Sequence, residues 1–365
     1  MKKKLYEKVQ DDILKQINTG LLKEGDKLPT EKQLMEKYGV SRVTINAALK
    51  ELKVNKIIKT NTINGTFVCN TNKKREFAHL LIPFVGILPT QKNSSTEMLD
   101  GIQKVATAND CIVPFYNTMN SPKQERDILK KLLNFNIDAL MIFPCLGNDN
   151  IDLLSLFAIK QIPLIFIDRR PRGFMNTLVT SNNFRGLEQL VQLLINKGHH
   201  KIATAILSEG SYPEQERFNG YVSALLKNKI PLKSEYFLGD METFSKYHKK
   251  SLFQRLSFLN DYCDLLVQKY EVLEDKPEII CCANDNDVLN LYAAFCRKYD
   301  GSLPNGLILT GFDNLNYPAI KNCPTIEQNF FSIGKVAIEV ALQQIMGKTP
   351  IPLIEIDTKV VLNGN

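Results

Sequence analysis

From residue 84 onward, short apolar runs alternate with amphipathic helical stretches. Strands are expected at 84–88, 111–116, 138–143, 163–168, 201–207, 278–283 and 306–312, and helices between them at 96–108, 122–134, 184–197, 217–227 and 287–298. Runs that are apolar on both faces are typical of parallel sheets covered by helices, which are built from such βα units. About 280 residues of this pattern exceed one sheet of ordinary size. We therefore predict an α/β fold in which two lobes carry parallel sheets.

The stretch from Leu28 to Leu52 differs, because it indicates two short helices joined by a tight turn. Thr30 and Gln33 form a capping box, Gly39 suits the end of the first helix, and Ser41 is placed to cap the second. One face of the second helix is apolar and the opposite face is polar; the two sets are Ile45, Ala48, Leu49 and Leu52, and Arg42, Asn46, Lys50 and Lys53. This pattern favours a helix-turn-helix that presents donors and cations to a DNA major groove. The alternative is a surface helix with a solvated charged face.

The flanking segments complete a small domain. Residues 5–18 carry one apolar stripe and are expected to be helical, while 56–60 and 65–69 are expected to be strands joined at the hairpin signal Asn64-Gly65. Three helices and a β-hairpin make a winged helix-turn-helix. We place this domain at 1–70, a polar linker at 71–80 and the α/β body at 81–365.

The charge is concentrated in the small N-terminal part. Residues 1–75 hold 17 Lys and Arg against 8 Asp and Glu, which is +9, and the remainder holds 29 against 31, which is −2. A basic excess beside a recognition helix suggests a polyanionic partner.

Other function classes find little support in the sequence. The eight cysteines form no C-x-x-C pair and the four histidines match no metal spacing, so buried cytosolic thiols are expected, with no metal and no cofactor. No apolar run reaches the roughly 20 residues of a membrane helix, and MKKKLYEKVQDD lacks the apolar core of a secretory signal. We therefore expect a cytoplasmic protein with no membrane partner.

The first 70 residues resemble the DNA-binding head of the GntR family of bacterial transcription regulators. The matching motifs are Gly25-Asp26-x-Leu28-Pro29-Thr30-Glu31, Tyr38-Gly39-Val40-Ser41-Arg42-x-Thr44, Ala48-Leu49-x-x-Leu52 and Gly65-Thr66-Phe67-Val68. The resemblance implies DNA contacts by Lys32, Ser41, Arg42, Thr44 and Asn46, with the wing at Gly65 in the minor groove; the charged stripe adds Lys50. Two positions depart from the family, which usually has Arg at Asn46 and glycine at Ile63. Asn46 can read adenine instead of guanine, so the operator sequence cannot be borrowed from relatives.

Nearly all of residues 84–365 resemble the effector-binding body of the LacI/GalR repressors, whose fold is that of periplasmic sugar-binding proteins. The motifs, in order, are Ile162-Pro163-x-x-x-x-Asp168-Arg169, Gly198-His199-x-Lys201-Ile202-Ala203, Arg217-x-x-Gly220-Tyr221, Pro277-x-Ile279, Ala283-Asn284-Asp285, Gly311-Phe312-Asp313 and Thr325-Ile326-x-Gln328. We expect lobe 1 at about 81–180 and 328–348, and lobe 2 at about 181–327 and 349–365. Residues 241–276 are expected to be helical and carry no motif.

Six polar residues are the candidate ligand site. Asp168, Arg169, Asn284 and Asp313 lie at or just past the carboxyl ends of expected strands, where open α/β sheets bind ligands. The resemblance adds Arg217 and Gln328 and implies that all six positions surround a monosaccharide. The structural alternative is that Asn284 caps a helix and that Asp168 and Arg169 form a surface ion pair.

The loop at 89–96 lacks the aromatic residue that this family often places against the sugar. It offers the small polar residues Ser94 and Ser95, and Phe143, Tyr116 or Phe174 could replace the missing ring. The identity of the sugar therefore stays open.

Together these features predict a sugar-responsive transcription regulator, a repressor rather than an enzyme. It would bind double-stranded operator DNA as a homodimer and respond to a monosaccharide, with a pentose or deoxyhexose such as arabinose or fucose as our guess. Alternatives are an activator, or a sensor of a purine or a phosphorylated sugar, for which the cleft offers Arg169, Arg170, Arg172 and Arg217. A sugar-processing enzyme lacks a P-loop, triad or metal cluster in the sequence. A plain carbohydrate-binding protein would not need the basic head.

Overall fold

The computed structural model describes two compact units, residues 1–75 and 76–365. The described residues are 5–18, 21–23, 25–54, 57–61, 65–69, 78–82, 94–135, 137–145, 150–207, 210–240 and 252–362. The expected strand at 84–88 therefore lies outside them, as do residues 71–77 of the expected linker at 71–80.

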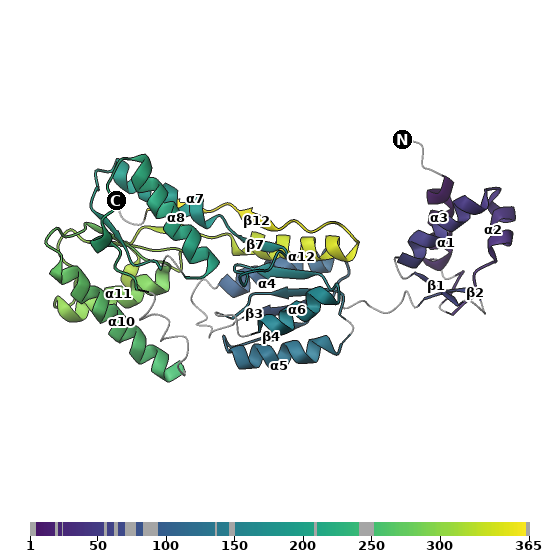
Figure 1. The fold of residues 1–365 in the computed structure, drawn as a ribbon, viewed down its shortest axis with the longest axis horizontal. Coiled ribbons are helices and arrows are strands. Elements are labelled where there is room, and N and C mark those ends of the chain that lie inside the picture. Colours follow the sequence, from purple (N-terminus) through teal and green to yellow (C-terminus); the bar gives the residue numbers. More distant parts are fainter. Residues whose placement is uncertain are drawn as a thin grey trace. The chain divides into compact units, whose positions relative to one another are not determined.

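The N-terminal unit is a winged helix-turn-helix (Figure 1). Its elements are α1 (Leu5–Asn18), α2 (Glu31–Tyr38), α3 (Arg42–Val54), β1 (Ile58–Asn61) and β2 (Gly65–Val68). The strands pair antiparallel with Ile58 opposite Val68. One apolar core joins the helices to the hairpin, with Ile13 on α1, Leu34 on α2 and Ile45 on α3 all buried. The predicted architecture of this unit is confirmed.

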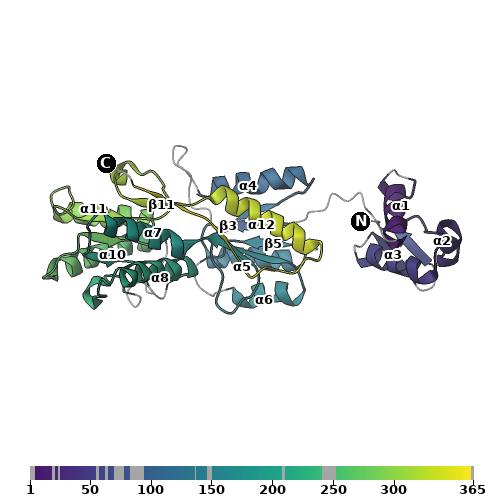
Figure 2. The same ribbon diagram turned by 90° about the horizontal axis from the view of Figure 1, so that it is seen from above.

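The larger unit contains two lobes, each a parallel sheet covered by helices (Figures 1 and 2). Lobe 1 holds β3 (His79–Ile82), α4 (Ser94–Ala108), β4 (Phe115–Asn117), α5 (Pro122–Leu133), β5 (Leu140–Ile142), α6 (Ile151–Ile159), β6 (Leu164–Ile167), β7 (Leu178–Ser181), α12 (Phe330–Ile345) and β12 (Leu353–Ile356). Its six strands follow the order β12-β7-β6-β5-β3-β4, and neighbours run parallel. The α/β class with a parallel sheet is thus confirmed.

Lobe 2 is built around a smaller sheet. It holds α7 (Asn183–Asn196), β8 (Ile202–Thr204), α8 (Tyr212–Lys227), η1 (Ser234–Tyr236), α10 (Leu252–Val272), β9 (Ile279–Cys281), α11 (Asp285–Lys298), β10 (Ile308–Thr310), η2 (Pro318–Ile320), β11 (Thr325–Glu327) and β13 (Lys359–Val361). Strands β10, β9 and β8 form a parallel sheet, and β11 pairs antiparallel with β13. Helix α10 occupies most of the stretch expected to be helical at 241–276.

The described chain passes between the lobes after β7, after β11 and after β12. Strand β12 pairs in parallel with β7 of lobe 1, so residues 353–356 belong to lobe 1 and not to lobe 2 as expected. The sequence could not show this, because the strand that β12 pairs with is far away in the chain, with Leu353 opposite Leu178. The last passage therefore follows Ile356.

Glycines allow the helices on each lobe to pack closely. A Cβ on Gly101 of α4 would lie 2.0 Å from the Phe331 carbonyl oxygen, and one on Gly334 of α12 would lie 2.0 Å from the Met98 carbonyl oxygen. In lobe 2, a Cβ on Gly220 of α8 would meet the Phe184 carbonyl oxygen at 2.3 Å. Any other residue at these positions would push the helices apart.

Candidate functional site

The exposed face of α3 carries the residues that the sequence assigns to DNA. Leu49 and its apolar neighbours on α3 are buried, whereas Arg42, Asn46 and Lys50 are exposed, as is Lys32 on α2. The exposed Ser41 caps α3: its Oγ accepts from the Thr44 amide at 3.3 Å and lies 3.0 Å from Thr44 Oγ1. The helix therefore offers a polar surface at its N-terminal turns, where a helix-turn-helix contacts base edges.

The structure adds one residue that the sequence analysis did not single out. Val43 is 79% exposed and lies on the same face of α3 as Asn46 and Lys50. An exposed β-branched residue among donors and cations is suited to contact a thymine methyl group. The signal was present in the sequence, because Val43 falls outside the apolar stripe of the helix.

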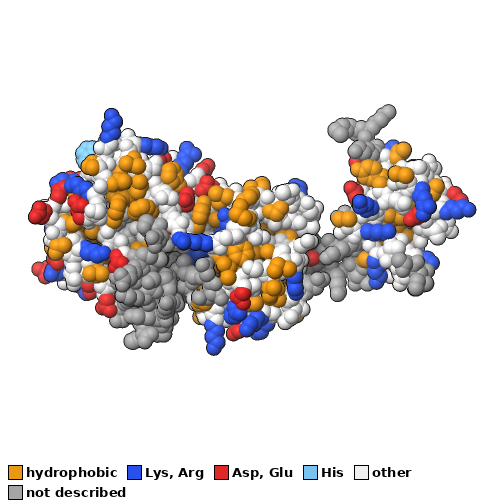
Figure 3. Space-filling model, viewed as in Figure 1, with side chains coloured by type: hydrophobic (Ala, Val, Ile, Leu, Met, Phe, Trp, Pro, Cys, Tyr) orange, Lys and Arg blue, Asp and Glu red, His pale blue; other side chains and the backbone are white. Residues whose placement is uncertain are grey.

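The wing is shaped around a glycine. Gly65 has φ +101°, and a Cβ there would lie 2.7 Å from Cε of Lys27. Across the hairpin, the hydroxyls of Thr60 and Thr66 lie 3.0 Å apart. A concavity of about 730 Å³ beside the wing is lined by Gly25, Lys59, Thr60, Asn61 and Phe67. Figure 3 shows Lys and Arg side chains over the visible face of this unit.

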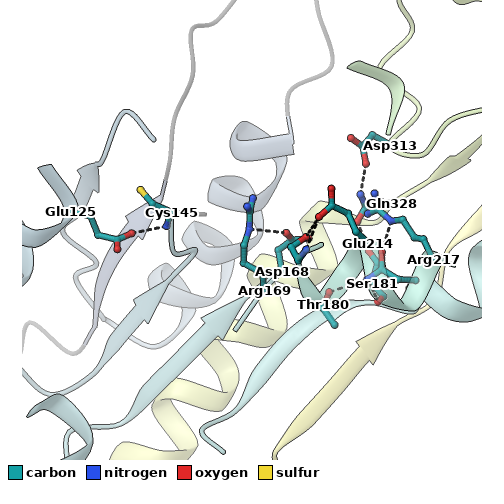
Figure 4. A network of polar contacts seen from close by, with 12 residues as sticks. Glu125, Cys145, Asp168, Arg169, Thr180, Ser181, Glu214, Arg217, Asp313 and Gln328 are labelled. Atoms are coloured by element: carbon teal, nitrogen blue, oxygen red, sulfur yellow. Dashed lines mark hydrogen bonds and ion pairs between the residues drawn. The ribbon is translucent and has the colours of Figure 1, made fainter. Parts of the chain in front are cut away.

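In the larger unit, polar residues from both lobes converge where the chain passes between them (Figure 4). Asp168 and Arg169 follow β6, Asp313 follows β10, Gln328 follows β11, and Arg217 lies in α8. The charges of Arg217, Asp285 and Asp168 all act on Asp313, so these groups share one electrostatic neighbourhood. Asp168 and Asp313 have φ of +63° and +121°, a strained backbone that clusters at functional sites.

Arg217 is held on three sides. Its Nε donates to Asn183 Oδ1 at 2.8 Å, one terminal nitrogen donates to the Ala283 carbonyl at 2.6 Å, and the guanidinium lies 3.8 Å from the centre of the Phe312 ring. The residue is only 5% exposed. Such a clamp fixes the remaining donors of the guanidinium for a ligand.

Asp313 and Gln328 form a second polar group. Gln328 Nε2 donates to the Asp313 carboxylate, and Gln328 Oε1 accepts from Ser181 Oγ at 2.6 Å. Burial raises the pKa of Asp313 from 3.8 to about 7, against the opposing charge of Arg217. Asp313 is therefore an acceptor whose ionisation is poised near neutral pH.

On the lobe 1 side, Arg169 lies between a carboxylate and an aromatic ring. Its Nε is 3.5 Å from Asp168 Oδ2, and its guanidinium lies 4.6 Å from the centre of Phe143. This Nε is buried and makes no hydrogen bond. Since Arg169 covers one face of Phe143, that face is a platform for the guanidinium rather than an open surface for a sugar.

The other two aromatic candidates have partners within lobe 1. Phe174 packs edge-on against Phe166 with 5.3 Å between ring centres, and the Tyr116 hydroxyl lies 3.1 Å from His79 Nδ1.

The remaining sequence candidates have local roles or limited description. Asn284 caps α11: its Oδ1 accepts from the Asp287 amide and its Nδ2 donates to Asp287 Oδ2, both at 3.0 Å. Ser94 and Ser95 open α4; Ser95 is half-buried, and the side chain of Ser94 lies outside the described residues. Burial also raises the pKa of Asp287 to about 7, with the charge of Glu214 adding to the shift.

A buried carboxylate in lobe 1 was not foreseen from the sequence. Glu125, 2% exposed, accepts from the Cys145 amide at 2.7 Å and from Asn150 Nδ2 at 2.8 Å. Glu125 therefore links Cys145, which follows β5, to Asn150, which immediately precedes α6. Burial raises the pKa of the Cys145 thiol to about 12, so this cysteine is unreactive.

Further features bear on other function classes. All eight cysteines are free thiols. Within the described ranges, no His, Cys, Asp and Glu group is arranged to hold a metal ion, and none of the described helices is long and apolar enough to cross a membrane.

Comparisons with known proteins follow the same division. Residues 5–68 match the family described as bacterial regulatory proteins, gntR family. Residues 84–245 match the periplasmic binding proteins and sugar binding domain of LacI family, and residues 191–362 match a periplasmic binding protein-like domain.

Three known proteins illustrate the similarity. The arabinose metabolism transcriptional repressor of Geobacillus stearothermophilus is 24% identical over 347 residues, covering 93% of this chain and 91% of that protein. The HTH-type transcriptional repressor PurR of Mannheimia succiniciproducens is 24% identical over 236 residues, covering 64% and 65%. A structure of the transcriptional regulator CelR in complex with cellobiose has a TM-score of 0.62 at 15% identity, covering 92% of this chain and 100% of that one. The chain therefore joins a GntR-type helix-turn-helix domain to a LacI-type, periplasmic-binding-protein-like effector domain, the organisation of a transcription regulator.

Proposed function

We propose that this protein represses transcription in the cytoplasm by binding operator DNA through α3 and the wing. We further propose that a neutral monosaccharide weakens that binding by occupying a cleft among the polar residues that meet between the lobes. The observation that carries the proposal is the meeting of Asp168, Arg169, Arg217, Asp313 and Gln328 at one place between the lobes. A sugar hydroxyl donates and accepts, and this set contains carboxylate acceptors, guanidinium donors and an amide that does both.

The charge balance of the cleft argues for a neutral effector over a phosphorylated one. Arg170 donates to the carbonyls of Asn176 and Pro352 at 2.7 and 2.8 Å, and Arg172 is exposed. Arg217 is engaged by Asn183 and Ala283. Arg169 and the remaining donors of Arg217 are then left for a ligand, with Asp168 beside Arg169 and Asp313 in the electrostatic neighbourhood of Arg217. A phosphate would meet more carboxylate than free guanidinium.

A purine is the second candidate effector, because relatives named PurR match much of the chain. A purine would need a flat aromatic partner, and Phe143 presents one face to Arg169 instead. We therefore rank a pentose or deoxyhexose first.

The proposed repressor would bind two half-sites of its operator. A helix-turn-helix regulator that acts as a two-fold homodimer recognises half-sites separated by whole helical turns of DNA. We infer that the protein is a homodimer. Sedimentation equilibrium at micromolar protein tests this inference: twice the mass of one chain is expected, and a monomer bound to a palindromic operator would contradict it.

The function is tested by fluorescence anisotropy of full-length protein on the DNA upstream of its own coding sequence. Salt is held fixed because phosphate contacts make affinity steeply salt-dependent. L-arabinose, L-fucose, D-xylose, D-ribose, ribose 5-phosphate, adenine and guanine are added in turn. Release by one neutral sugar supports the proposal; tighter binding on addition of a sugar would indicate a corepressor.

Two variants test DNA binding and the response to sugar separately in this assay. Arg42→Ala is expected to bind DNA more weakly, and Asp168→Asn to bind DNA but respond less to the sugar. Turnover of a sugar with ATP would instead reveal an enzyme. If only ribose 5-phosphate or a purine releases the DNA, the neutral-sugar assignment is wrong.

A further inference from the structure

Asn183 lies at the first passage between the lobes and uses both ends of its side-chain amide. It is the first residue of α7, two residues beyond the end of β7, and it is 0% exposed. Its Oδ1 accepts from Arg217 Nε at 2.8 Å. Its Nδ2 donates to the Ser181 carbonyl at 2.8 Å and lies 3.3 Å from Thr180 Oγ1.

The contact with Arg217 ties Asn183 to the cleft. The Arg217 guanidinium is clamped between Asn183, the Ala283 carbonyl and the Phe312 ring. A ligand that draws Arg217 toward the cleft must pull on these partners. Because Asn183 is fully buried and hydrogen-bonded at both ends, it cannot move without moving the backbone at Ser181.

Residues 180–183 also contact the second polar group of the cleft, Gln328 and Asp313, and the sheet of lobe 1. Ser181 Oγ donates to Gln328, which in turn donates to Asp313. On the other side, the Asn182 amide donates to the Ile356 carbonyl at 2.9 Å, and β7 lies between β6 and β12. Residues 180–183 thus connect two cleft side chains to β7 and to the edge strand β12 of lobe 1.

We infer that Asn183 is a positioning residue that transmits occupancy of the cleft at Arg217 to the interlobe passage, so that it sets how strongly the effector changes DNA binding. This inference rests on the proposed role of the cleft in effector binding. A ligand shifts a conformational equilibrium only through a difference in its contacts with the two states, and the Asn183 amide links the ligand-facing arginine to the segment that would differ.

The substitution Asn183→Asp tests the two hydrogen bonds of the Asn183 amide separately, one to Arg217 and one to the Ser181 carbonyl. Aspartate keeps an acceptor for Arg217 Nε but cannot donate to the Ser181 carbonyl. Asn183→Ser is a second variant, used in case the buried carboxylate impairs folding. Its shorter side chain should weaken the hydrogen bonds to both Arg217 and the Ser181 carbonyl. Asn182→Asp is the matched control, since the Asn182 side chain caps α7 by accepting from the Arg185 amide at 3.1 Å and aspartate caps equally well.

The first measurement compares DNA affinity with and without 10 mM L-arabinose, L-fucose, D-xylose or D-ribose for full-length wild type and the three variants. Couplings between sites are typically about 5–150-fold. We expect the wild type and Asn182→Asp to show the same ratio of affinities, and the ratios for Asn183→Asp and Asn183→Ser to fall toward one. If a sugar changes the wild-type affinity and all four proteins show the same ratio, the inference is overturned.

The second measurement needs no effector and separates failure of this inference from failure of the proposed function. Amide hydrogen exchange at residues 178–183 is followed for wild type, Arg217→Lys, Asn183→Asp and the double variant. If Asn183 carries the link, Arg217→Lys speeds exchange in the wild-type background and has no further effect beside Asn183→Asp. Equal effects in both backgrounds refute the link, even if none of the four sugars acts on the wild type.

Discussion

The Nε atom of Arg42 donates a hydrogen bond to Oε2 of Glu31 over 2.9 Å, which joins the first turn of α3 to the first turn of α2. The arginine side chain nevertheless remains 73% exposed. Glu31 thus orients the guanidinium of a largely exposed side chain. A guanidinium fixed in this way is suited to a bidentate contact with guanine or with a phosphate.

Removing this side chain tests which of the two contacts it makes. If Arg42 reads guanine, Arg42→Ala should lower operator affinity by about 5–150-fold, from the roughly 1–3 kcal/mol of a bidentate base contact. If it binds phosphate, affinity for operator and scrambled DNA should fall together and the salt slope should drop by about one. Anisotropy titrations between 50 and 200 mM salt distinguish the outcomes. Lys130→Ala, on α5 of the larger unit, is the control and should change neither quantity.

Val43 should read a thymine methyl group. The methyl contact is worth about 0.8 kcal/mol, or about fourfold in affinity. Replacing one operator thymine with uracil, which lacks that methyl, should weaken binding of the wild type by about this factor at the contacted position. Val43→Ala should be insensitive to the same replacement. An equal loss for wild type and Val43→Ala at every position would show that Val43 makes no such contact.

The sequence predicted those elements whose signals are local. Thr30 with Gln33, Gly39 and Ser41 sit within a few residues of the helix ends they specify, and the structure places caps at each. The expected strands at 138–143 and 163–168 contain β5 and β6, because long apolar runs need no knowledge of partners. Strands β7, β11, β12 and β13 were missed because each is three or four residues long and is defined by a distant partner, such as Leu353 opposite Leu178.

The same reasoning applies to the cleft. Asp168, Arg169 and Asp313 were found because residues after strands gather at one sheet edge. Asn183 carried no signal, since its meaning depends on Arg217, 34 residues further along. Phe143 was expected as the last residue of a strand at 138–143 and lies directly after β5, but only the structure shows that Arg169 covers one of its faces. The expectation that residues 71–80 form a linker failed at its end, where β3 begins at His79 and pairs with β4 and β5.

Arg169 should contribute to effector affinity through its planar shape. Arg169→Lys keeps the charge but loses the stack on Phe143 and the fixed fork of donors. Hydrogen bonds to charged groups contribute about 1.5–3 kcal/mol, so the dissociation constant of the active sugar should rise by about 10–150-fold. Isothermal titration calorimetry measures this change, with Arg172→Lys as the matched control on an exposed arginine. An unchanged dissociation constant would place Arg169 outside the ligand contacts.

Stability of the unliganded protein should fall as pH rises toward neutrality. The pKa values of Asp313 and Asp287 are raised from 3.8 to about 7 by burial, so the folded state holds these protons more tightly than the unfolded chain. Their stabilising effect is complete below about pH 3.8 and is lost as pH rises through 7. Asp152, whose pKa is lowered to about 2 by Arg126, acts only at lower pH. Urea midpoints between pH 5 and 8 should decrease, with a shallower slope in Asp313→Asn.

Sugar affinity should change with pH in the opposite direction. The ionised carboxylate of Asp313 accepts more strongly from a sugar hydroxyl than the neutral acid does. With a pKa of about 7, its ionised fraction rises from about one in eleven at pH 6 to about ten in eleven at pH 8, so affinity should rise about tenfold. Calorimetric titration at pH 6, 7 and 8 measures this. Asp313→Asn should bind weakly and without pH dependence, while Asp287→Asn should keep the profile. If the profile disappears only in Asp287→Asn, the titrating group is Asp287 and Asp313 stays ionised throughout this range.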